Sequence, residues 1–280
     1  MPPSFAASVH PPEDTSQPAL WFLFRGHRLL VETNGGGARL PRLSSPDSLG
    51  LPLLNERYLG YWNGDSPPIH CYCGEIAEDA APPAGYALES LRPLYSLLDE
   101  KMFWLAGRAI QIVEWNSTNR YCGRCGQATV DHENDRAKVC PQCGLTSYPR
   151  LAPAVIVRVT RPTTNGSEIL LARANRFPTA MFSVLAGFVE PGETLEECVE
   201  REIQEEVGIT VRNIRYFGSQ PWPFPHSLMI AFTADYDAGE LAIDSGELAA
   251  ADWFPPDALP PIPPPPSIAN RLIADWLGEP

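Results

Sequence analysis

Residues 187–209 read GFVEPGETLEECVEREIQEEVGI, and this stretch decides the fold of the region around it. Pro191 and Gly192 favour a turn, so we expect a helix to begin after them with Thr194 as its N-cap. Gly208 is suited to end that helix, because glycine readily adopts the left-handed conformation common at helix C-termini. Apolar residues recur every four positions between these ends and form a stripe that can pack on a sheet: Val199, Ile203 and Val207.

Three glutamates lie on the neighbouring face of this predicted helix. Glu202, Glu205 and Glu206 are spaced i, i+3 and i+4, so their side chains converge. Carboxylates this close repel one another unless a cation joins them, and hard oxygen ligands suit Mg²⁺ or Mn²⁺. Arg201 precedes Glu205 by one helical turn and is placed to orient it. The alternative interpretation is a solvated acidic helix face.

Acids, an arginine and glycines stand at fixed distances in the same stretch. The pattern G-x5-E-x7-R-E-U-x-E-E-x-G-U, in which U is apolar, is filled from Gly187 to Ile209. It matches the Nudix box at every fixed position, so the chain resembles the Nudix hydrolases. The resemblance implies metal-dependent attack on a diphosphate linked to another group. It favours the metal site over the solvated acidic face.

Strand and helix patterns alternate irregularly in residues 150–280. Runs rich in Val and Ile, together with later alternating segments, predict strands at 152–160, 168–174, 211–220 and 228–236. Residues 182–190 lead into the box, and Ser267 is the predicted N-cap of a last helix that ends at Gly278. This order predicts an α/β/α sandwich on a mixed sheet, which is also the fold that the Nudix resemblance implies.

Residues 1–118 are predicted to form a separate α+β domain. The first 18 residues are rich in Pro and Ser, and we expect them to be disordered. Strands are expected on both sides of residues 25–27 and at 58–62 and 69–73, and helices at 88–99 and 100–115. The composition of this domain indicates no chemistry of its own.

Four of the seven cysteines form two Cys-x2-Cys pairs separated by fourteen residues: Cys122 and Cys125, then Cys140 and Cys143. This spacing is close to that of a zinc ribbon, so we expect residues 119–149 to hold one structural Zn²⁺ through four thiolates. A redox dithiol is the alternative for one pair, and two pairs favour zinc. The other cysteines (71, 73 and 198) fit a reducing compartment better than a disulfide framework.

The composition is that of a soluble globular protein, with 44% apolar and 20% charged residues in a chain of 280 residues. No apolar run reaches about 18 residues, so we expect no membrane span. The N-terminal residues lack the pattern of a secretory signal, so we expect a cytoplasmic protein. The formal net charge of −13 argues against general nucleic-acid binding, which requires a surplus of Lys and Arg.

A second motif follows the box at residues 219–229, which read SQPWPFPHSLM. Its three prolines fix the backbone and remove amide donors, so we expect a stiff, extended and non-helical segment. Such a segment can present Gln220, His226 and Ser227 to a ligand with little ordering cost. The alternative is a proline-rich loop whose aromatic residues pack on the core.

The box, the four-cysteine ribbon and SQPWPFPxS together resemble the NADH pyrophosphatase family of Nudix hydrolases. The similarity extends from about Leu91 to Leu277 and includes LAGRA, YPR-x2-PAVIV, LAGFVE and the tail PPPP-S-IANRLI. It implies hydrolysis of NAD(H) to nicotinamide mononucleotide and AMP. It also implies a divalent cation at the box, structural zinc, and a homodimer whose sites are completed across the interface.

The resemblance also assigns residues to roles. Glu202, Glu205 and Glu206 match catalytic acids, with Arg201 beside them. The divalent cation is matched to Glu202, Glu206, Glu247 and the Ala186 carbonyl. Dinucleotide contacts are matched to Gln220, Pro221, Trp222, Pro223, Phe224, Pro225, His226 and Ser227, with Tyr148, Phe188, Ala269 and Arg92 as neighbours. Asp135 occupies a position where an acid can touch substrate. Either Glu205 or Glu206 can be the general base.

Two other functions fit the same sequence. The site can act on NAD-capped RNA 5′ ends, because the acidity of the chain disfavours long RNA contacts but not recognition of the tip. The chain can instead be a non-catalytic module in which the ribbon recruits nucleic acid or protein. An intact box is evidence against this last hypothesis.

Overall fold

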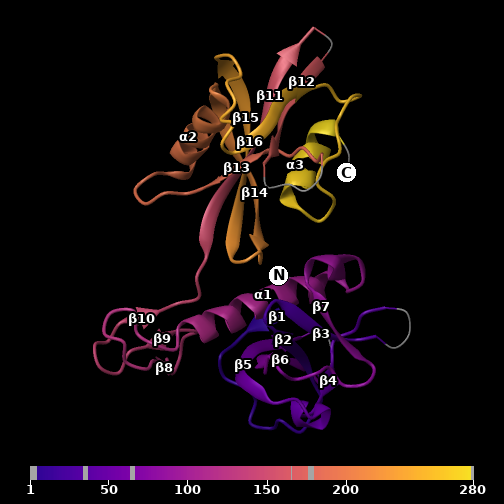
Figure 1. Cartoon of the computed structure of the whole chain (residues 1–280), viewed down its shortest axis with the longest axis vertical. Helices are drawn as coiled ribbons and strands as arrows, with labels where there is room; N and C mark the ends of the chain where they lie inside the picture. Colours follow the sequence, from indigo (N-terminus) through magenta and orange to yellow (C-terminus); the bar gives the residue numbers. More distant parts are fainter. Residues whose placement is uncertain (1–4, 34–36, 64–66, 165, 176–179, 279–280) are drawn as a thin grey trace. The chain divides into compact units, whose positions relative to one another are not determined.

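The computed structural model describes residues 5–33, 37–63, 67–164, 166–175 and 180–278. The chain divides into two compact units, Met1–Arg150 and Leu151–Pro280 (Figure 1). The predicted α+β domain and the ribbon both fall within the first unit. Among the described residues, no helix is long and apolar enough to cross a membrane.

The second unit is built on a mixed sheet. Its strands run in the order β14 (Thr210–Trp222), β15 (Ser227–Ala238), β11 (Ala152–Thr163), β12 (Gly166–Ala174) and β16 (Leu248–Phe254). β13 (Leu185–Phe188) also pairs with β11. The β11–β15 pair is parallel and the other pairs are antiparallel.

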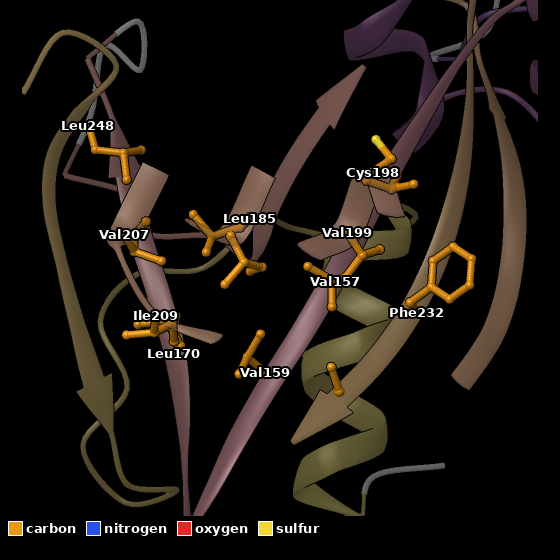
Figure 2. Close-up of a cluster of buried hydrophobic side chains, with 14 of the residues drawn as sticks. Val157, Val159, Leu170, Leu185, Cys198, Val199, Val207, Ile209, Phe232 and Leu248 are labelled. Carbon is orange, nitrogen blue, oxygen red and sulfur yellow. The ribbon is translucent and has the colours of Figure 1, made fainter. Parts of the chain in front are cut away.

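Two helices cover opposite faces of this sheet, because successive residues of a strand point to opposite sides. Val155, Val157 and Val159 of β11 belong to the core beneath α2 (Leu195–Val207), whereas Ile156 belongs to the core beneath α3 (Ile268–Leu277). The α2 core is drawn in Figure 2, where residues of the sheet meet residues of the helix: Val157, Val159, Leu170, Leu185, Val199 and Val207. The predicted α/β/α sandwich on a mixed sheet is confirmed.

The first unit repeats the same strand order. Its sheet runs β1 (Phe5–Ala7), β5 (Leu53–Trp62), β6 (Ile69–Ile76), β2 (Ala19–Arg25), β3 (Arg28–Glu32) and β7 (Tyr86–Ser90), and β4 (Arg42–Leu43) also pairs with β2. β2 and β6 are parallel, as β11 and β15 are in the second unit. α1 (Glu100–Thr118) packs on β6, β5 and β2, as α3 packs on β15, β14 and β11.

The two units differ at the position of the box helix. Between β13 and β14 the second unit has α2, whereas between β4 and β5 the first unit has only a short 3₁₀ helix, Pro46–Leu49. The ribbon after α1 is a three-stranded antiparallel sheet of β8 (Val130–Asp131), β9 (Lys138–Val139) and β10 (Thr146–Ser147).

Two predictions for the first unit are corrected. Residues 88–99 do not form one continuous α-helix, because β7 pairs with β3 up to Ser90 and only a short 3₁₀ helix (Arg92–Ser96) follows it. The segment 1–18 was expected to be disordered; residues 1–4 lie outside the described residues, and β1, which begins at Phe5, pairs with β5. Phe5 also lies 6.3 Å from Trp62 between ring centroids. In both places long-range strand pairing overrides the local composition.

Candidate active site

The ends of α2 fix where its acidic side chains point. Thr194 Oγ1 accepts from the Glu197 amide at 3.2 Å, and the Glu197 carboxylate accepts from the Thr194 amide at 2.7 Å. This reciprocal pair is a capping box, and it confirms Thr194 as the N-cap. Gly208 ends the helix with φ 74° and donates to the Gln204 carbonyl at 3.1 Å, which confirms its predicted role.

Arg201 connects the box residues to one another. It makes a bidentate pair with Glu193, at 2.9 Å from Nε and 2.6 Å from Nη2. Nη1 donates to Glu202 at 2.8 Å and to Glu205 at 3.1 Å, and Nη2 donates to the Phe188 carbonyl at 2.9 Å. The hydrogen bonds from Arg201 lower the pKa of Glu193 to about 2. Arg201 therefore orients Glu205, as expected, and also two further carboxylates.

The Glu202 carboxylate lies directly against Gly187. A Cβ added at position 187 would overlap the carboxylate atoms of Glu202. The box therefore requires glycine here for close approach, not for an unusual backbone angle. Burial raises the pKa of Glu202, hydrogen bonds from Arg201 oppose this, and the charges of Glu205 and Glu247 raise it further.

Glu247 lies on a turn far along the chain that is tied to the acidic helix α2. The Asp244 amide donates to the Glu206 carbonyl at 3.0 Å, which ties the turn to the last part of α2. The Glu247 amide donates to the Asp244 carbonyl at 3.1 Å, and the Glu247 carbonyl accepts from the Asn175 amide at 2.8 Å. The charge of Glu247 also raises the pKa of Glu202, so the turn carries Glu247 toward the acidic face of α2.

The acids of the cluster differ in exposure. The side chain of Glu205 is 60% exposed, that of Glu202 is 13% exposed, and Glu206 is 8% exposed as a residue. The charges of Glu205 and Glu247 raise the pKa of Glu202, and a hard divalent cation at these carboxylates would relieve their repulsion. Ala186, whose carbonyl is the predicted fourth ligand, precedes Gly187 on β13 opposite Ile156.

The four ribbon cysteines have the geometry of a zinc site. Sγ–Sγ separations are 3.5 Å for Cys122–Cys143, 3.5 Å for Cys125–Cys140 and 3.8 Å for Cys125–Cys143. A tetrahedron with Zn–S bonds of about 2.3 Å has edges of about 3.8 Å. Within the described part of the chain, these cysteines are the one group of three or more potential ligands whose atoms all lie within 4.8 Å of one another.

Two equivalent turns carry the cysteine pairs. The Gly126 amide donates to the Cys122 carbonyl at 2.9 Å, and the Gly144 amide donates to the Cys140 carbonyl at 3.0 Å. Both glycines have positive φ, 74° and 72°. Backbone amides directed at the sulfur lower the pKa of Cys122 to about 6, which favours the thiolate that zinc requires.

Residues 220–227, predicted to contact the dinucleotide, form the tip of the β14–β15 hairpin. Trp222 pairs with Ser227, and the rings of Trp222 and Phe224 lie 5.2 Å apart in an edge-on arrangement. The His226 carbonyl accepts from the Ala152 amide at 3.0 Å. Gln220 is buried, and its amide bonds to backbone atoms around the N-terminus of α3.

The remaining predicted contacts belong to different units. Phe188 is 57% exposed at the end of β13, and Ala269 is buried in the first turn of α3. Tyr148, Arg92 and Asp135 lie in the first unit, where Tyr148 is exposed and the Asp135 amide donates to His132 Nδ1 at 3.0 Å.

Two residues near the acids were given no role by the sequence. Glu193 is a fixed position of the box, and it binds Arg201 through two hydrogen bonds. The distance of eight residues between them in the sequence does not predict this contact. Cys198 lies inside the same network, with Sγ 3.5 Å from the Phe188 carbonyl and 3.5 Å from Arg201 Nη2. The sequence could have indicated this contact, because Cys198 precedes Arg201 by about one turn of the helix.

Replacing one ribbon thiol should remove the metal and destabilise the chain. We expect Cys122→Ser to lose bound zinc and to lower the melting temperature, because metal-binding energy is folding energy in such ribbons. Cys71→Ser, at a buried cysteine outside the ribbon, is the control and should keep its zinc. Elemental analysis and calorimetry measure both. Full zinc content in Cys122→Ser would contradict a four-thiolate site.

Adding one methyl group at position 187 should displace Glu202. We expect Gly187→Ala to weaken Mn²⁺ binding by roughly tenfold or more, since misplacing a metal ligand costs about this much. Gly218→Ala adds the same group where the nearest atom lies 4.0 Å away, and it should bind Mn²⁺ normally. Titration followed by electron paramagnetic resonance reports the affinity. Equal affinities in the two variants would remove Glu202 from the metal site.

Comparison with known proteins covers most of the chain. The family models for the NADH pyrophosphatase-like rudimentary NUDIX domain, the NADH pyrophosphatase zinc ribbon domain and the NUDIX domain match residues 18–115, 117–148 and 150–276. A Pseudomonas aeruginosa protein named NAD-capped RNA hydrolase NudC is 48% identical over 229 residues, which cover 82% of this chain and 79% of that protein.

Two further relatives carry the same name. The protein from Pseudomonas fluorescens is 44% identical, covering 95% of this chain and 92% of its own length. The protein from Deinococcus radiodurans is 42% identical, covering 93% and 88%. Three domain matches in chain order and relatives aligned over most of their length lead to one assignment: the chain belongs to the zinc-ribbon-containing NADH pyrophosphatase family of Nudix hydrolases.

Proposed function

We propose that this protein hydrolyses the diphosphate of NAD(H) and releases nicotinamide mononucleotide and AMP. The observation that carries the proposal is the group of acids on and beside α2. Glu202 lies against Gly187 there, and the charges of Glu205 and Glu247 raise its pKa. An intact cluster of this kind disfavours a non-catalytic module. The names of the relatives support a substrate that contains NAD.

The acids have distinct roles in this proposal. Glu202, Glu206 and Glu247, with the Ala186 carbonyl, would hold Mg²⁺ or Mn²⁺. A divalent cation bound there would neutralise the charge of the diphosphate and activate the attacking water. Glu205 or Glu206 accepts the proton from the attacking water. Arg201 keeps Glu202 and Glu205 in fixed rotamers through the bonds described above.

Selectivity for a dinucleotide must come from outside the box, because the acids can act on any diphosphate that reaches them. We assign it to the hairpin residues 221–227 and to Phe188, with Ala269, Tyr148 and Arg92 as further contacts. Phe188 is the best-supported base-stacking residue. Its carbonyl is held by Arg201 while its ring is exposed beside the cluster.

NAD at the 5′ end of RNA is the second candidate substrate, and the name shared by all three relatives favours it. The same acids would cut the same diphosphate. A formal net charge of −13 limits contacts along an RNA chain, so recognition would be confined to the NAD tip.

We also infer that the chain acts as a homodimer with the domain division 1–118, 119–149 and 150–280. The family resemblance supports both statements. Light scattering distinguishes the mass of one chain from that of two.

The reaction is tested with NADH, NAD⁺, ADP-ribose and NAD-capped RNA, each incubated with Mg²⁺ or Mn²⁺ and analysed for products. We expect nicotinamide mononucleotide and AMP from NADH. Glu206→Gln should reduce the rate at least about a hundredfold at saturating metal with the fold intact, because it removes the charge of a metal ligand. Glu200→Gln, at an exposed position of the same helix, should retain the rate. Near-normal turnover by Glu206→Gln would exclude this site.

The role of Phe188 is tested by removing its ring. A base stacked on an aromatic side chain is worth roughly 1–3 kcal/mol, so Phe188→Ala should lower kcat/KM for NADH about five- to a hundredfold. The Arg201 contact is made by the backbone carbonyl, so Mn²⁺ affinity should be unchanged. The matched measurement is hydrolysis of a small diphosphate that lacks one base. If both substrates lost activity equally, Phe188 would not be a base-stacking residue.

A further inference from the structure

Gln220 is one of the few buried polar residues in the described part of the chain, with 6% of its surface exposed. It lies on β14 directly before the proline-rich tip of the hairpin and pairs with Met229 of β15. A buried amide must find hydrogen-bond partners, because an unsatisfied donor or acceptor is costly. The partners that Gln220 uses therefore identify what the side chain does.

Both polar atoms of the Gln220 amide bond to the backbone of one short segment. Oε1 accepts from the Ile268 amide at 2.8 Å, and Nε2 donates to the Pro266 carbonyl at 2.8 Å. These two residues flank Ser267, the N-cap of α3. The amide therefore bridges the cap as a peptide group would, with a donor and an acceptor side by side.

The segment that Gln220 holds is itself closed by local bonds. Ser267 Oγ donates to the Pro264 carbonyl at 2.9 Å and accepts from the Asn270 amide at 3.3 Å. Asn270 Nδ2 donates to the Pro263 carbonyl at 3.0 Å. Residues 263–270 thus form one unit, and Gln220 fixes that unit to the base of the hairpin.

We propose that Gln220 is a positioning residue that acts through α3 and does not itself contact the substrate. It holds the hairpin tip (221–227) and the first turn of α3, which contains Ala269, in one mutual arrangement. This inference rests on the proposed function only in taking both segments as walls of the dinucleotide site. Loss of the amide lets the two walls separate, so substrate binding weakens while the acids of α2 remain in place.

The chain offers a matched control at the other end of the same helix. Arg158 of β11 donates to the Leu272 carbonyl at 2.9 Å and to Asp275 at 2.6 Å. Arg158→Met therefore loosens the C-terminal half of α3, and Gln220→Met loosens its N-terminus. Both should lower the melting temperature, so a general effect of weaker helix docking would be the same in the two variants.

Steady-state kinetics with NADH separates the two effects. We expect Gln220→Met to raise KM roughly tenfold, which is the scale of losing a buried hydrogen-bonded contact, with kcat changed less than about threefold. Arg158→Met should leave KM within about twofold. Gln220→Asn, which keeps the amide but is too short to reach both partners, should change KM in the same direction and serves if Gln220→Met does not fold. An unchanged KM at position 220, or an equal rise in both variants, would overturn the proposal.

Hydrogen exchange of the full chain without substrate tests the positioning role independently of the reaction. The amides of residues 268–270 should exchange faster in Gln220→Met than in wild type or Arg158→Met. Unchanged exchange would overturn the proposal whatever the substrate is. Faster exchange in a protein whose wild type does not hydrolyse NADH would retain the role of Gln220 and reject the proposed reaction.

Discussion

The contact between Gly187 and the Glu202 carboxylate is the constraint on which the site depends. Glu202 approaches β13 so closely that no side chain fits at position 187. That approach lets Arg201 hold Glu202 and the Phe188 carbonyl together, since β13 and α2 are adjacent. The bidentate bond to Glu193 fixes the arginine from the opposite side. The cluster is thus a rigid acidic surface, prepared before any cation binds.

The two units show what this cluster adds to a common framework. Both have the same strand order, the same parallel pair in the middle and a helix that follows the last strand. The first unit replaces the box helix with four residues of 3₁₀ helix, and its corresponding face is covered by apolar and aromatic side chains such as Trp21 and Tyr72, stacked 4.8 Å apart. A four-residue helix cannot present acids at i, i+3 and i+4 on one face. Chemistry is therefore assigned to the second unit.

The features of the fold that depend on neighbouring residues could be predicted from the sequence. The ends of α2 at Thr194 and Gly208 follow from capping chemistry, and its buried stripe follows from helical period. Residues 88–90 were wrongly predicted to be helical because their pairing with β3 is decided by residues far along the chain, and only a short 3₁₀ helix forms after them. The burial of Gln220 was missed for the same reason, since a glutamine before a proline motif does not reveal where its amide bonds. Glu247 could be proposed only through resemblance, because the turn that carries it is fixed by contacts to Glu206 and Asn175.

Contacts with residues far along the chain also hold the ribbon in place, and they explain why the ribbon belongs to the first unit. Arg136, in its hairpin, donates to the Tyr58 carbonyl at 3.0 Å and to the Ser8 carbonyl at 2.7 Å. Arg57 of β5 reaches Asp131, which also accepts from Lys138 at 2.7 Å. The two Arg136 bonds satisfy backbone carbonyls of β5 and of the residue after β1 that would otherwise need water. Zinc that closes the ribbon therefore also stabilises β5 and the segment that follows β1, because the ribbon residue Arg136 binds both.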